Sequence, residues 1–323
     1  MELVTKKQLE LISGRAHPEL AEEVARHLGI ELTEANLVDF ASSEIRCRFG
    51  DSIRGADVFI IQSHAAPVND SIMEQLIMID AAKRASAKRI TAVCPYYGYG
   101  RQDRKAEGRE PITAKLVTDM LATAGADRIV AVDLHANQIQ GFFDGPFDHL
   151  MAVPMLIDYV RNHVTGDIVV VAADPGRIKV AERYARDIDT DLATIYKRRT
   201  KGKINLVEAL GVMGDVQGRN CVLIDEMIDS GGTIVAAVEM LKNQGAEEIW
   251  VVATHGVLSG PAVDRLKNAP ITKLVLTNTL PIGSDKQFDK MEVLSVAHVV
   301  ADAIRAVFED ASVSELFGGE NQI

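Results

Sequence analysis

The sequence has few cysteines and few aromatic residues. Aromatic side chains make up 5% of its 323 residues, and there are three cysteines, Cys47, Cys94 and Cys221. An odd number of cysteines without metal-ligand spacing argues against a disulfide framework and against a zinc module. Each cysteine lies in an apolar, strand-like stretch, so we expect the three to be small buried side chains.

Long apolar runs are also missing. None approaches the roughly 18 residues of a membrane-spanning helix, and the beginning, MELVTKKQLE, has no apolar block of a secretory signal. With 35 Lys and Arg against 46 Asp and Glu, the net charge of -11 argues against nucleic-acid binding by diffuse attraction. We expect a cytoplasmic protein with no membrane or nucleic-acid partner, in which local basic residues or a divalent cation hold any anionic ligand.

The chain nevertheless has enough hydrophobic residues to form a large core. Hydrophobic residues make up 47% of the sequence, and the length suggests about two domains. Short β-rich runs alternate with amphipathic helical stretches, which indicates an α/β fold with mostly parallel sheets and ligands at the carboxyl ends of the strands. The expected strands are ELVTK…LISG, DVFIIQS, RITAVCPYYG, RIVAVDLHA, DIVVVAADPG, CVLIDEMID, EIWVVATHG and KLVLTNTL.

A helix-turn-strand segment occurs twice, without gaps, at an offset of 120 residues, the distance from Gly125 to Gly245. Convergence on a common unit is one explanation, and the ungapped register favours duplication. We therefore expect two related α/β domains, residues 1–153 and 154–323, with the last helix packing back on the first. The aligned pairs are Thr113 with Thr233, Met120 with Met240, Leu121 with Leu241, Ala126 with Ala246, Ile129 with Ile249, Val132 with Val252 and His135 with His255.

The stretch VLIDEMIDSGGT carries the strongest chemical signal. A buried strand ends in Asp225 and Glu226, and Asp229 to Thr233 then lead into a helical pattern. The glycines allow close approach of backbone N–H groups to an anion, and a helix start favours negative charge. An ordinary strand-to-helix turn is the alternative. We expect a phosphate site, beside which the two acids accept hydrogen bonds from sugar hydroxyls or meet a metal.

In the first copy a long basic loop, GYGRQDRKAEGREPIT, takes the place of this turn. Arg101, Gln102 and Asp103 follow a strand end directly. A solvated crossing is the alternative interpretation. Arginine forks suit phosphate oxygens, and a glutamine and a carboxylate can contact a base edge or orient the arginines. The loop therefore predicts a grip for a nucleoside triphosphate.

Three more strand ends carry candidates. His135 is either a core histidine or a ligand, and we expect Asp133 on the same strand face beside it. Asp174 precedes Pro175-Gly176 and is a turn former, a ligand or both. The run from Lys197 to Lys203 is either a solvated face or a basic flap that closes on anionic substrates, and the weak periodicity up to Gly214 favours the flap.

Together these motifs resemble the ribose-phosphate diphosphokinases, also called phosphoribosyl pyrophosphate synthetases, of the phosphate-activated bacterial type. The resemblance runs nearly end to end, and DLHANQIQGFF and GYGRQDRK are its specific motifs. The VLIDEMIDSGGT turn is shared with the wider phosphoribosyltransferase family. The other matching segments are SGRAHPELA, SIRGADVFIIQS, PITAKLV, KRR, ATHGVLSGPA and SVSELF.

The resemblance implies two tandem phosphoribosyltransferase-like domains and transfer of the β,γ-diphosphoryl group of ATP to the 1-hydroxyl of ribose 5-phosphate, with Mg2+ required. The products are phosphoribosyl pyrophosphate and AMP. The implied ATP-binding residues are Ser42, Ser43, Glu44, Arg101, Gln102 and Asp103. Implied metal ligands are His135 and Asp174, and implied catalytic residues are Lys197, Arg199 and His135. The implied ribose 5-phosphate site is Arg199, Asp225, Glu226, Asp229, Ser230, Gly231, Gly232 and Thr233.

Oligomeric state and regulation are implied by the resemblance alone. Members of the family usually form hexamers that phosphate activates and ADP inhibits at a site between subunits. The matching positions are Ser52, Arg54, Arg89, Ser312 and Ser314.

Three positions depart from the family pattern. Ser43 takes the place of a glycine before Glu44, and Arg177 follows Gly176 where a second glycine is more common, as in some actinobacterial members. Glu226 replaces the usual second aspartate, and its extra methylene moves the carboxylate by about one C–C bond, enough to change a hydrogen bond to a ribose hydroxyl.

Two other functions remain open. A phosphoribosyltransferase would share the acidic turn but would not need GYGRQDRK or KRR. A non-catalytic regulatory subunit would be expected to lack His135, Lys197 or the acidic turn, and this chain has all three.

Overall fold

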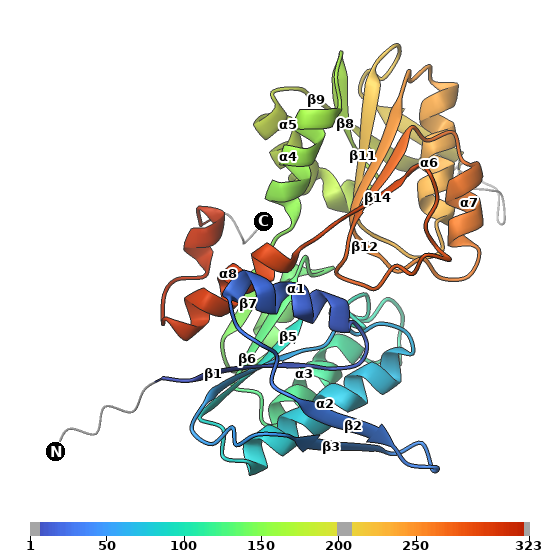
Figure 1. The fold of residues 1–323 in the computed structure, drawn as a ribbon. Coiled ribbons are helices and arrows are strands. Elements are labelled where there is room, and N and C mark those ends of the chain that lie inside the picture. Colours follow the sequence, from blue (N-terminus) through green and yellow to red (C-terminus); the bar gives the residue numbers. More distant parts are fainter. Residues whose placement is uncertain (1–6, 199–208, 320–323) are drawn as a thin grey trace. The chain divides into compact units, whose positions relative to one another are not determined.

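The structure, a computed structural model, describes residues 7–198 and 209–319 (Figure 1). The chain folds into two compact units. Of the described residues, unit 1 comprises 7–151, 279–281 and 295–319, and unit 2 comprises 152–198, 209–278 and 282–294. The chain thus leaves unit 1 after Met151 and returns to it near its end.

Unit 1 is built on a five-stranded parallel sheet of order β1-β4-β5-β6-β7. All five residues of β4 are buried, as expected for a parallel strand covered on both faces. Figure 1 shows α2 and α3 on one face of this sheet and α1 and α8 on the other. The bounds are β1 Leu9–Ser13, β4 Asp57–Ile61, β5 Arg89–Cys94, β6 Arg128–Val132, β7 Phe147–Leu150, α1 Pro18–Leu28, α2 Val68–Arg84, α3 Thr113–Ala124 and α8 Ala297–Phe308.

Local sequence signals explain where helix α1 begins and ends. Pro18 occupies its first turn, where a missing N–H costs nothing, and Glu19 follows in the same turn. Gly29 ends the helix in a left-handed conformation with φ of 71°. The buried side chains Leu20 and Val24 lie on one face of the helix, which is the face that α8 and the sheet cover.

Unit 2 contains a seven-stranded sheet of order β10-β9-β8-β11-β12-β13-β14. Only β9 and β10 pair antiparallel within it. Figure 1 shows α4 and α5 on one face and α6 and α7 on the other. The bounds are β8 Ile168–Ala172, β9 Asp191–Arg198, β10 Ala209–Met213, β11 Asn220–Ile228, β12 Ile249–Gly256, β13 Lys273–Thr277, β14 Met291–Leu294, α4 Val153–His163, α5 Ile178–Ile188, α6 Gly232–Asn243 and α7 Ala262–Asn268.

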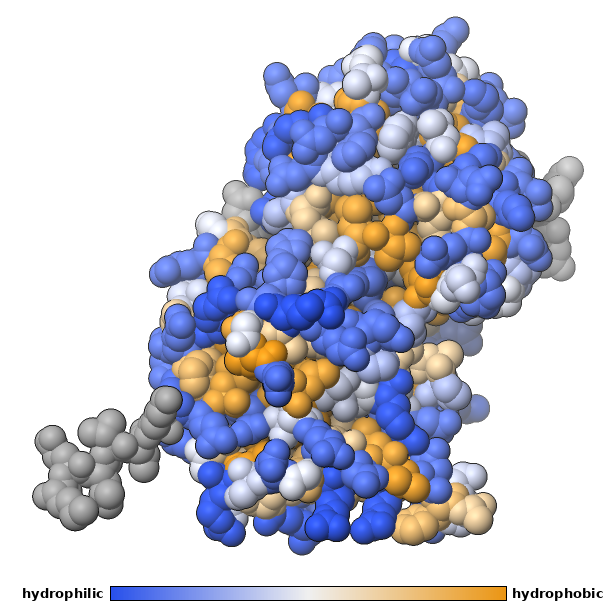
Figure 2. Space-filling model, viewed as in Figure 1, coloured by the Kyte–Doolittle hydropathy of each residue, from blue (hydrophilic) through white to orange (hydrophobic). Residues whose placement is uncertain are grey.

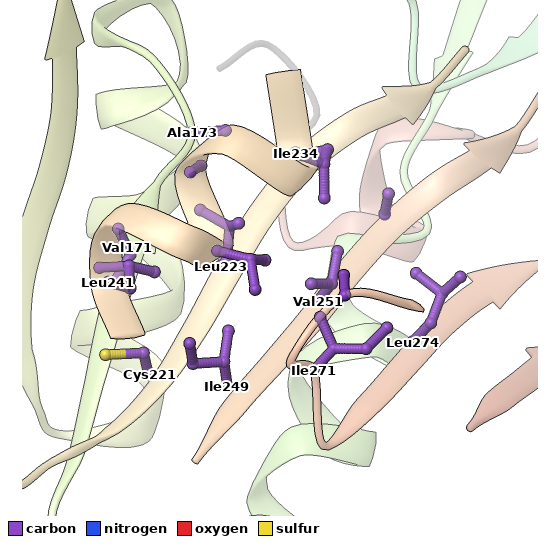
Figure 3. Packing of buried hydrophobic residues seen from close by; sticks show 14 of the residues in the cluster. Val171, Ala173, Cys221, Leu223, Ile234, Leu241, Ile249, Val251, Ile271 and Leu274 are labelled. Atoms are coloured by element: carbon purple, nitrogen blue, oxygen red, sulfur yellow. The ribbon is translucent and has the colours of Figure 1, made fainter. Parts of the chain in front are cut away.

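The core under α6 fixes the strand that leads to the acidic turn. Figure 3 shows Leu223 of β11 and Val251 of β12 beneath Ile234 and Leu241 of α6. Each of these four side chains is at most 2% exposed. Burying one such side chain stabilises the fold by roughly 1.5–3 kcal/mol. Strand β11 is therefore firmly packed up to the residue before Asp225.

The repeated segments adopt the same local structure. They form α3 with β6 in unit 1 and α6 with β12 in unit 2. The turn after each helix has the same backbone hydrogen bond. Ala126 N–H donates to Leu121 O (3.0 Å), and Ala246 N–H donates to Leu241 O (3.1 Å). Gly125 and Gly245 both have positive φ at this turn. In the sheets, the neighbouring strands β5-β6-β7 of unit 1 correspond to β11-β12-β13 of unit 2. The strands on the other side of β5 and of β11 come in different chain orders, β1-β4 in unit 1 and β10-β9-β8 in unit 2.

The expected α/β class with mostly parallel sheets is confirmed, and a strand forms in each of the eight expected stretches, although the ELVTK part of the first lies outside the described residues. The sequence patterns did not predict a separate hairpin of β2 Ala35–Asp39 and β3 Ile45–Phe49, which pairs antiparallel and packs against α2. Strand β10 was also missed, since it lies in the stretch of weak periodicity before Gly214.

Of the helices in the described ranges, none is long and apolar enough to cross a membrane. On the face seen in Figure 2, hydrophilic residues surround separate groups of hydrophobic ones. Of the three cysteines, Cys94 and Cys221 are buried as expected, and Cys47 in β3 is half-buried.

Candidate functional site

The turn after β11 has the shape of an anion site. Gly231 takes a left-handed conformation (φ 74°) and Gly232 begins α6. The first N–H groups of a helix have no intrahelical acceptor and favour negative charge. Ser230, Gly232 and Thr233 are exposed beside them. The structure therefore brings the predicted phosphate-binding residues together around one helix start.

Two residues outside the acidic turn, Ser259 in the matching segment ATHGVLSGPA and Arg265 just after it, anchor this turn. Ser259 N–H donates to Asp229 O (3.1 Å), and the Ser259 hydroxyl donates to Asp229 Oδ1. Arg265 Nη1, from α7, donates to Ser230 O (3.0 Å). These bonds fix the backbone of the turn through Asp229 and Ser230. Both residues lie about 30 residues or more beyond the turn in the sequence, so their contacts with Asp229 and Ser230 could not be predicted from local spacing.

The acid pair at the end of β11 is held by an arginine. Arg177 Nε lies 2.7 Å from Glu226 Oε2 and 4.0 Å from Asp225 Oδ1. Glu226 N–H donates to Asp225 Oδ1 (2.8 Å). Burial raises the pKa of Asp225, the neighbouring Glu226 raises it further, and Arg177 opposes the rise. The two departures from the family pattern in unit 2, Arg177 and Glu226, are thus in direct contact.

Asp174 follows the adjacent strand β8 at the same sheet edge, since Ala172 pairs with Ile224 of β11. Its Oδ1 accepts from Gly176 N–H (2.6 Å), which makes it the cap of a short 3-10 helix over Pro175–Arg177. The residue is exposed. The geometry allows both roles predicted from the sequence, turn former and ligand. Oδ1 accepts the Gly176 hydrogen bond that forms the turn, and a carboxylate has a second oxygen for a ligand.

In unit 1 the basic loop follows β5, and a buried polar network supports its start. Gly98 N–H donates to Nδ1 of His64 (2.9 Å), so the Nε2 of His64 carries the proton and donates to Gln75 Oε1 (2.8 Å). His64 is fully buried, and this burial lowers its pKa to about 4. A Cβ on Gly98 would lie 2.9 Å from the Cβ of His64, so only glycine fits.

The predicted ATP residues of this loop differ in exposure. Arg101 and Gln102 are exposed, and Gln102 O accepts from Ala114 N–H (3.1 Å) at the start of α3. Asp103 is buried and accepts from Gln138 Nε2. Gln138 belongs to DLHANQIQGFF, so the two motifs specific to the family contact each other. Asp103 is better placed to fix the loop than to reach a ligand.

His135 lies just beyond β6, in a turn held by a second buried histidine. Strand β6 ends at Val132, and Asp133 takes a left-handed conformation (φ 39°). The expectation that Asp133 and His135 share a strand face is therefore wrong, because the strand alternation stops before them. Leu134 N–H donates to His149 Nε2 (2.9 Å), which fixes the turn that presents His135.

Ser42, Ser43 and Glu44 form the tip of the β2-β3 hairpin. Phe40 N–H donates to Glu44 O (2.9 Å), and the Ser42 hydroxyl donates to Glu44 Oε2 (2.8 Å). Ser43 has φ of 68°, a conformation that favours glycine. The serine thus keeps the backbone shape that the family's glycine would adopt, at a cost of roughly 1–2 kcal/mol.

A cavity of about 950 Å3 lies between this hairpin and α2. Arg15 spans it, with its Nε 2.5 Å from Glu74 Oε2 and its Nη2 2.7 Å from Asp39 Oδ1. The volume suits a nucleotide. The acids outnumber the one arginine, so the lining would repel a triphosphate. The charged residues lining it are Arg15, Asp39, Glu44, Asp70 and Glu74.

The residues predicted for regulation are partly gathered in unit 1. Arg89 Nη2 lies 2.7 Å from Asp57 Oδ2, and its Nη1 lies 3.0 Å from Asp310 Oδ1. Asp310 precedes a turn in which the hydroxyls of Ser312 and Ser314 are 3.1 Å apart. Ser52 and Arg54 are exposed in the loop before β4. An anion bound by Arg89 would compete with two carboxylates.

Arg199 and most of the basic flap, up to residue 208, lie outside the described residues, as does the side chain of Lys197. Within the described ranges no group of three or more His, Cys, Asp or Glu side chains forms a metal site. Mg2+ commonly binds through one or two carboxylates, substrate phosphates and waters. Asp174 fits this requirement, and the imidazole of His135 suits a hard cation less well.

Comparison with known proteins extends over both units. Residues 9–125 match the N-terminal domain of ribose phosphate pyrophosphokinase, and residues 203–318 match the phosphoribosyl synthetase-associated domain. The chain is 56% identical over 313 residues to a ribose-phosphate pyrophosphokinase of Streptomyces coelicolor, which covers 97% of both chains. It is 55% identical over 317 residues to one from Mycobacterium bovis, covering 98% of this chain and 97% of the relative.

A solved structure supports the same relationship. The crystal structure of phosphoribosylpyrophosphate synthetase from Mycobacterium smegmatis matches with a TM-score of 0.90 and 53% sequence identity. The match covers 94% of this chain and 100% of that chain.

Proposed function

The chain belongs to the family of ribose-phosphate pyrophosphokinases, which make phosphoribosyl pyrophosphate from ATP and ribose 5-phosphate, and on this premise we propose where each substrate binds. Ribose-phosphate pyrophosphokinase is another name for the ribose-phosphate diphosphokinase that the sequence motifs resemble. High identity over nearly the full length favours this enzyme over a phosphoribosyltransferase. Residues 1–153 are the proposed ATP-binding domain, and residues 154–323 are the proposed ribose 5-phosphate domain apart from residues 279–281 and 295–319, which belong to unit 1.

The proposed ribose 5-phosphate site is the turn after β11. The single observation that carries this proposal is the start of α6 at Gly232, with Gly231 left-handed and Ser230 and Thr233 exposed beside the first N–H groups. A phosphate monoester is an anion of the size that such a helix start binds. Asp225, four residues before Asp229 in the last part of β11, would accept hydrogen bonds from the sugar hydroxyls.

The proposed ATP grip is the loop after β5 together with the hairpin tip. Arg101 is exposed and supplies a planar fork for phosphate oxygens. Gln102 is exposed beside it and can contact the base or the sugar. Ser42, Ser43 and Glu44 offer hydroxyls and a carboxylate, which suit the nucleoside part of ATP better than its triphosphate, because acids dominate the adjoining cavity.

Mg2+ is the proposed cofactor, with Asp174 as the fitting ligand and His135 as a second candidate. When bound, it neutralises phosphate charge, since two unit charges about 4 Å apart repel by roughly 4 kcal/mol at an effective dielectric near 20. The 1-hydroxyl of ribose 5-phosphate attacks the β-phosphorus of ATP, the bond to the α-phosphate oxygen breaks, and AMP leaves. The protein needs no covalent group for this step, only positioning and charge.

Lys197 and Arg199 are proposed to stabilise the transferring group. Positive charge that meets the phosphoryl oxygens only during transfer lowers the barrier without tightening substrate binding. Hexamer formation, activation by phosphate and inhibition by ADP through Ser52, Arg54, Arg89, Ser312 and Ser314 are proposed from the resemblance. The cytoplasmic location stays a prediction.

The test of the proposed function follows AMP by chromatography after purified protein is mixed with ATP, ribose 5-phosphate and Mg2+. We expect AMP release that depends on ribose 5-phosphate. A phosphoribosyltransferase would instead consume phosphoribosyl pyrophosphate in the presence of a base, and a regulatory subunit would release no AMP. Asp229→Asn should raise the KM for ribose 5-phosphate, whereas Lys273→Gln, in an ion pair with Glu292 on β13 and β14, should not.

A further inference from the structure

Arg177 is nearly covered by the two acids at the edge of the sheet in unit 2. Its side chain is 15% exposed, that of Asp225 is 14% exposed and that of Glu226 is 9% exposed. The short 3-10 helix that carries Arg177 follows β8, and β8 pairs in parallel with β11, which carries the acids. The contact therefore joins the ends of two neighbouring strands.

The geometry assigns unequal contacts to the two acids. Glu226 Oε2 lies at hydrogen-bond distance from Arg177 Nε, at 2.7 Å, whereas Asp225 Oδ1 lies at 4.0 Å. A carboxylate engaged by a guanidinium in a covered site is held in one orientation. The longer glutamate side chain brings its carboxylate to Arg177, and the carboxyl groups of Glu226 and Asp225 also lie within hydrogen-bonding range of each other. Asp225 keeps the shorter side chain, and its Oδ1 accepts from Glu226 N–H.

We propose that Arg177 and Glu226 are a positioning pair: Arg177 holds the Glu226 carboxylate away from the substrate and leaves Asp225 as the acid that meets the sugar hydroxyls. The guanidinium of Arg177 also neutralises the charge of the Glu226 carboxylate beside the proposed phosphate site. Neutralising a carboxylate near a bound anion lowers their mutual repulsion, so the ion pair affects substrate binding. The inference rests on the proposed ribose 5-phosphate site.

A double-mutant cycle tests the pair through the KM values for both substrates. Arg177→Gln removes the guanidinium that contacts Glu226, and Glu226→Gln removes the carboxylate that Arg177 contacts at 2.7 Å while leaving Asp225 at 4.0 Å from it. We expect each single variant to raise the KM for ribose 5-phosphate about tenfold and to change the KM for ATP by less than about twofold. The double variant removes both charges, so its KM for ribose 5-phosphate should lie within about threefold of the wild type, a non-additivity typical of contacting residues.

Other outcomes would overturn the proposal. If the double variant is as impaired as Glu226→Gln alone, Glu226 contacts the sugar itself. If Arg177→Gln shifts both KM values equally, the arginine is structural. Should Arg177→Gln fail to fold, Arg177→Lys keeps the charge but loses the Nε geometry, and an unchanged KM for ribose 5-phosphate in that variant would count against the positioning role.

The underlying site is tested separately. Asp225→Asn should raise the KM for ribose 5-phosphate with no rescue by Arg177→Gln or Glu226→Gln. If Asp225→Asn and Asp229→Asn both leave that KM unchanged, the proposed ribose 5-phosphate site is wrong. If they raise it while the cycle is additive, only the positioning pair fails. Lys273→Gln serves as the matched control, because it breaks another ion pair of unit 2.

Discussion

His64 shows how a single buried residue can set the position of a functional loop. It accepts from Gly98 N–H and donates to Gln75, whose Nε2 in turn donates to Ile60 O and Val93 O. The network therefore ties the ends of β4 and β5 to the first residues of the basic loop. A buried network of this kind is stabilising only while every member keeps its partner.

Acidification should test this network. The pKa of His64 is lowered by burial from 6.5 to about 4, so the unfolded chain binds an extra proton between these values. Stability from this group is therefore complete above pH 6.5 and is lost as the pH falls to about 4, by up to roughly 3 kcal/mol. His64→Gln should unfold with a shallower pH dependence in this window, measured by thermal melts. His298→Gln, at an exposed site, should keep the wild-type slope.

Lys197 and Arg199 give a second test at the residue scale. If they act on the transferring group alone, Lys197→Ala and Arg199→Ala should lower kcat by more than about tenfold and leave the KM for ATP nearly unchanged. Steady-state kinetics with varied ATP provide the measurement. Unchanged turnover with a raised KM for ATP would assign both residues to substrate binding instead.

At the scale of elements, the turn between β11 and α6 depends on backbone conformation as much as on side chains. The nearest atoms to a Cβ on Gly231 would be those of Ala262 at 3.5 Å, an ordinary contact, so the constraint there is its φ of 74°. Gly218 has nearly the same φ (71°) and open space around it. It lies before β11, at the opposite end of the strand from the turn.

These two glycines form a matched pair of test sites. Alanine in a left-handed conformation costs roughly 1–2 kcal/mol, so Gly231→Ala and Gly218→Ala should lower the melting temperature by similar amounts. Only Gly231→Ala should raise the KM for ribose 5-phosphate, because it disturbs the helix start that is proposed to hold the phosphate. Equal effects of the two substitutions on that KM would contradict the assignment.

At the scale of the whole molecule, unit 1 is completed by the end of the chain. Helix α8 buries Val300, Ile304 and Val307. Arg305 Nη2 donates to His27 O (3.1 Å), at the end of α1. Burying three such side chains contributes roughly 5–9 kcal/mol at about 1.5–3 kcal/mol each. This is comparable to the net stability of a typical domain, about 5–15 kcal/mol.

Truncation should therefore unfold unit 1. A chain that ends at Leu294 lacks α8 and should lose cooperative unfolding and become sensitive to limited proteolysis within residues 1–151. A chain that ends at Gly319 keeps every described element and should melt like the full-length protein. If the shorter chain retains the full-length melting temperature, α8 is not part of the stable core of unit 1.

The amino-acid sequence by itself determined the α/β class, the eight expected strands, the repeated helix-turn-strand segment and the position of the acidic turn. These features depend on short-range patterns, namely apolar runs, helical spacing, glycines and caps, which act within a few residues. The hairpin of β2 and β3 was not predicted because it has no continuous apolar run. Its residues are half-buried or exposed.

Only the tertiary structure decided which side chains meet. Asp103 is bound by Gln138, 35 residues away, and Arg89 by Asp310, 221 residues away. Arg177 and Glu226 were visible in the sequence as two separate departures, and their contact at 2.7 Å turns them into one feature. Arg177 and Glu226 meet because parallel strands bring their carboxyl ends to one edge, and chain order alone does not fix that β8 pairs with β11, which follows it only after β9 and β10.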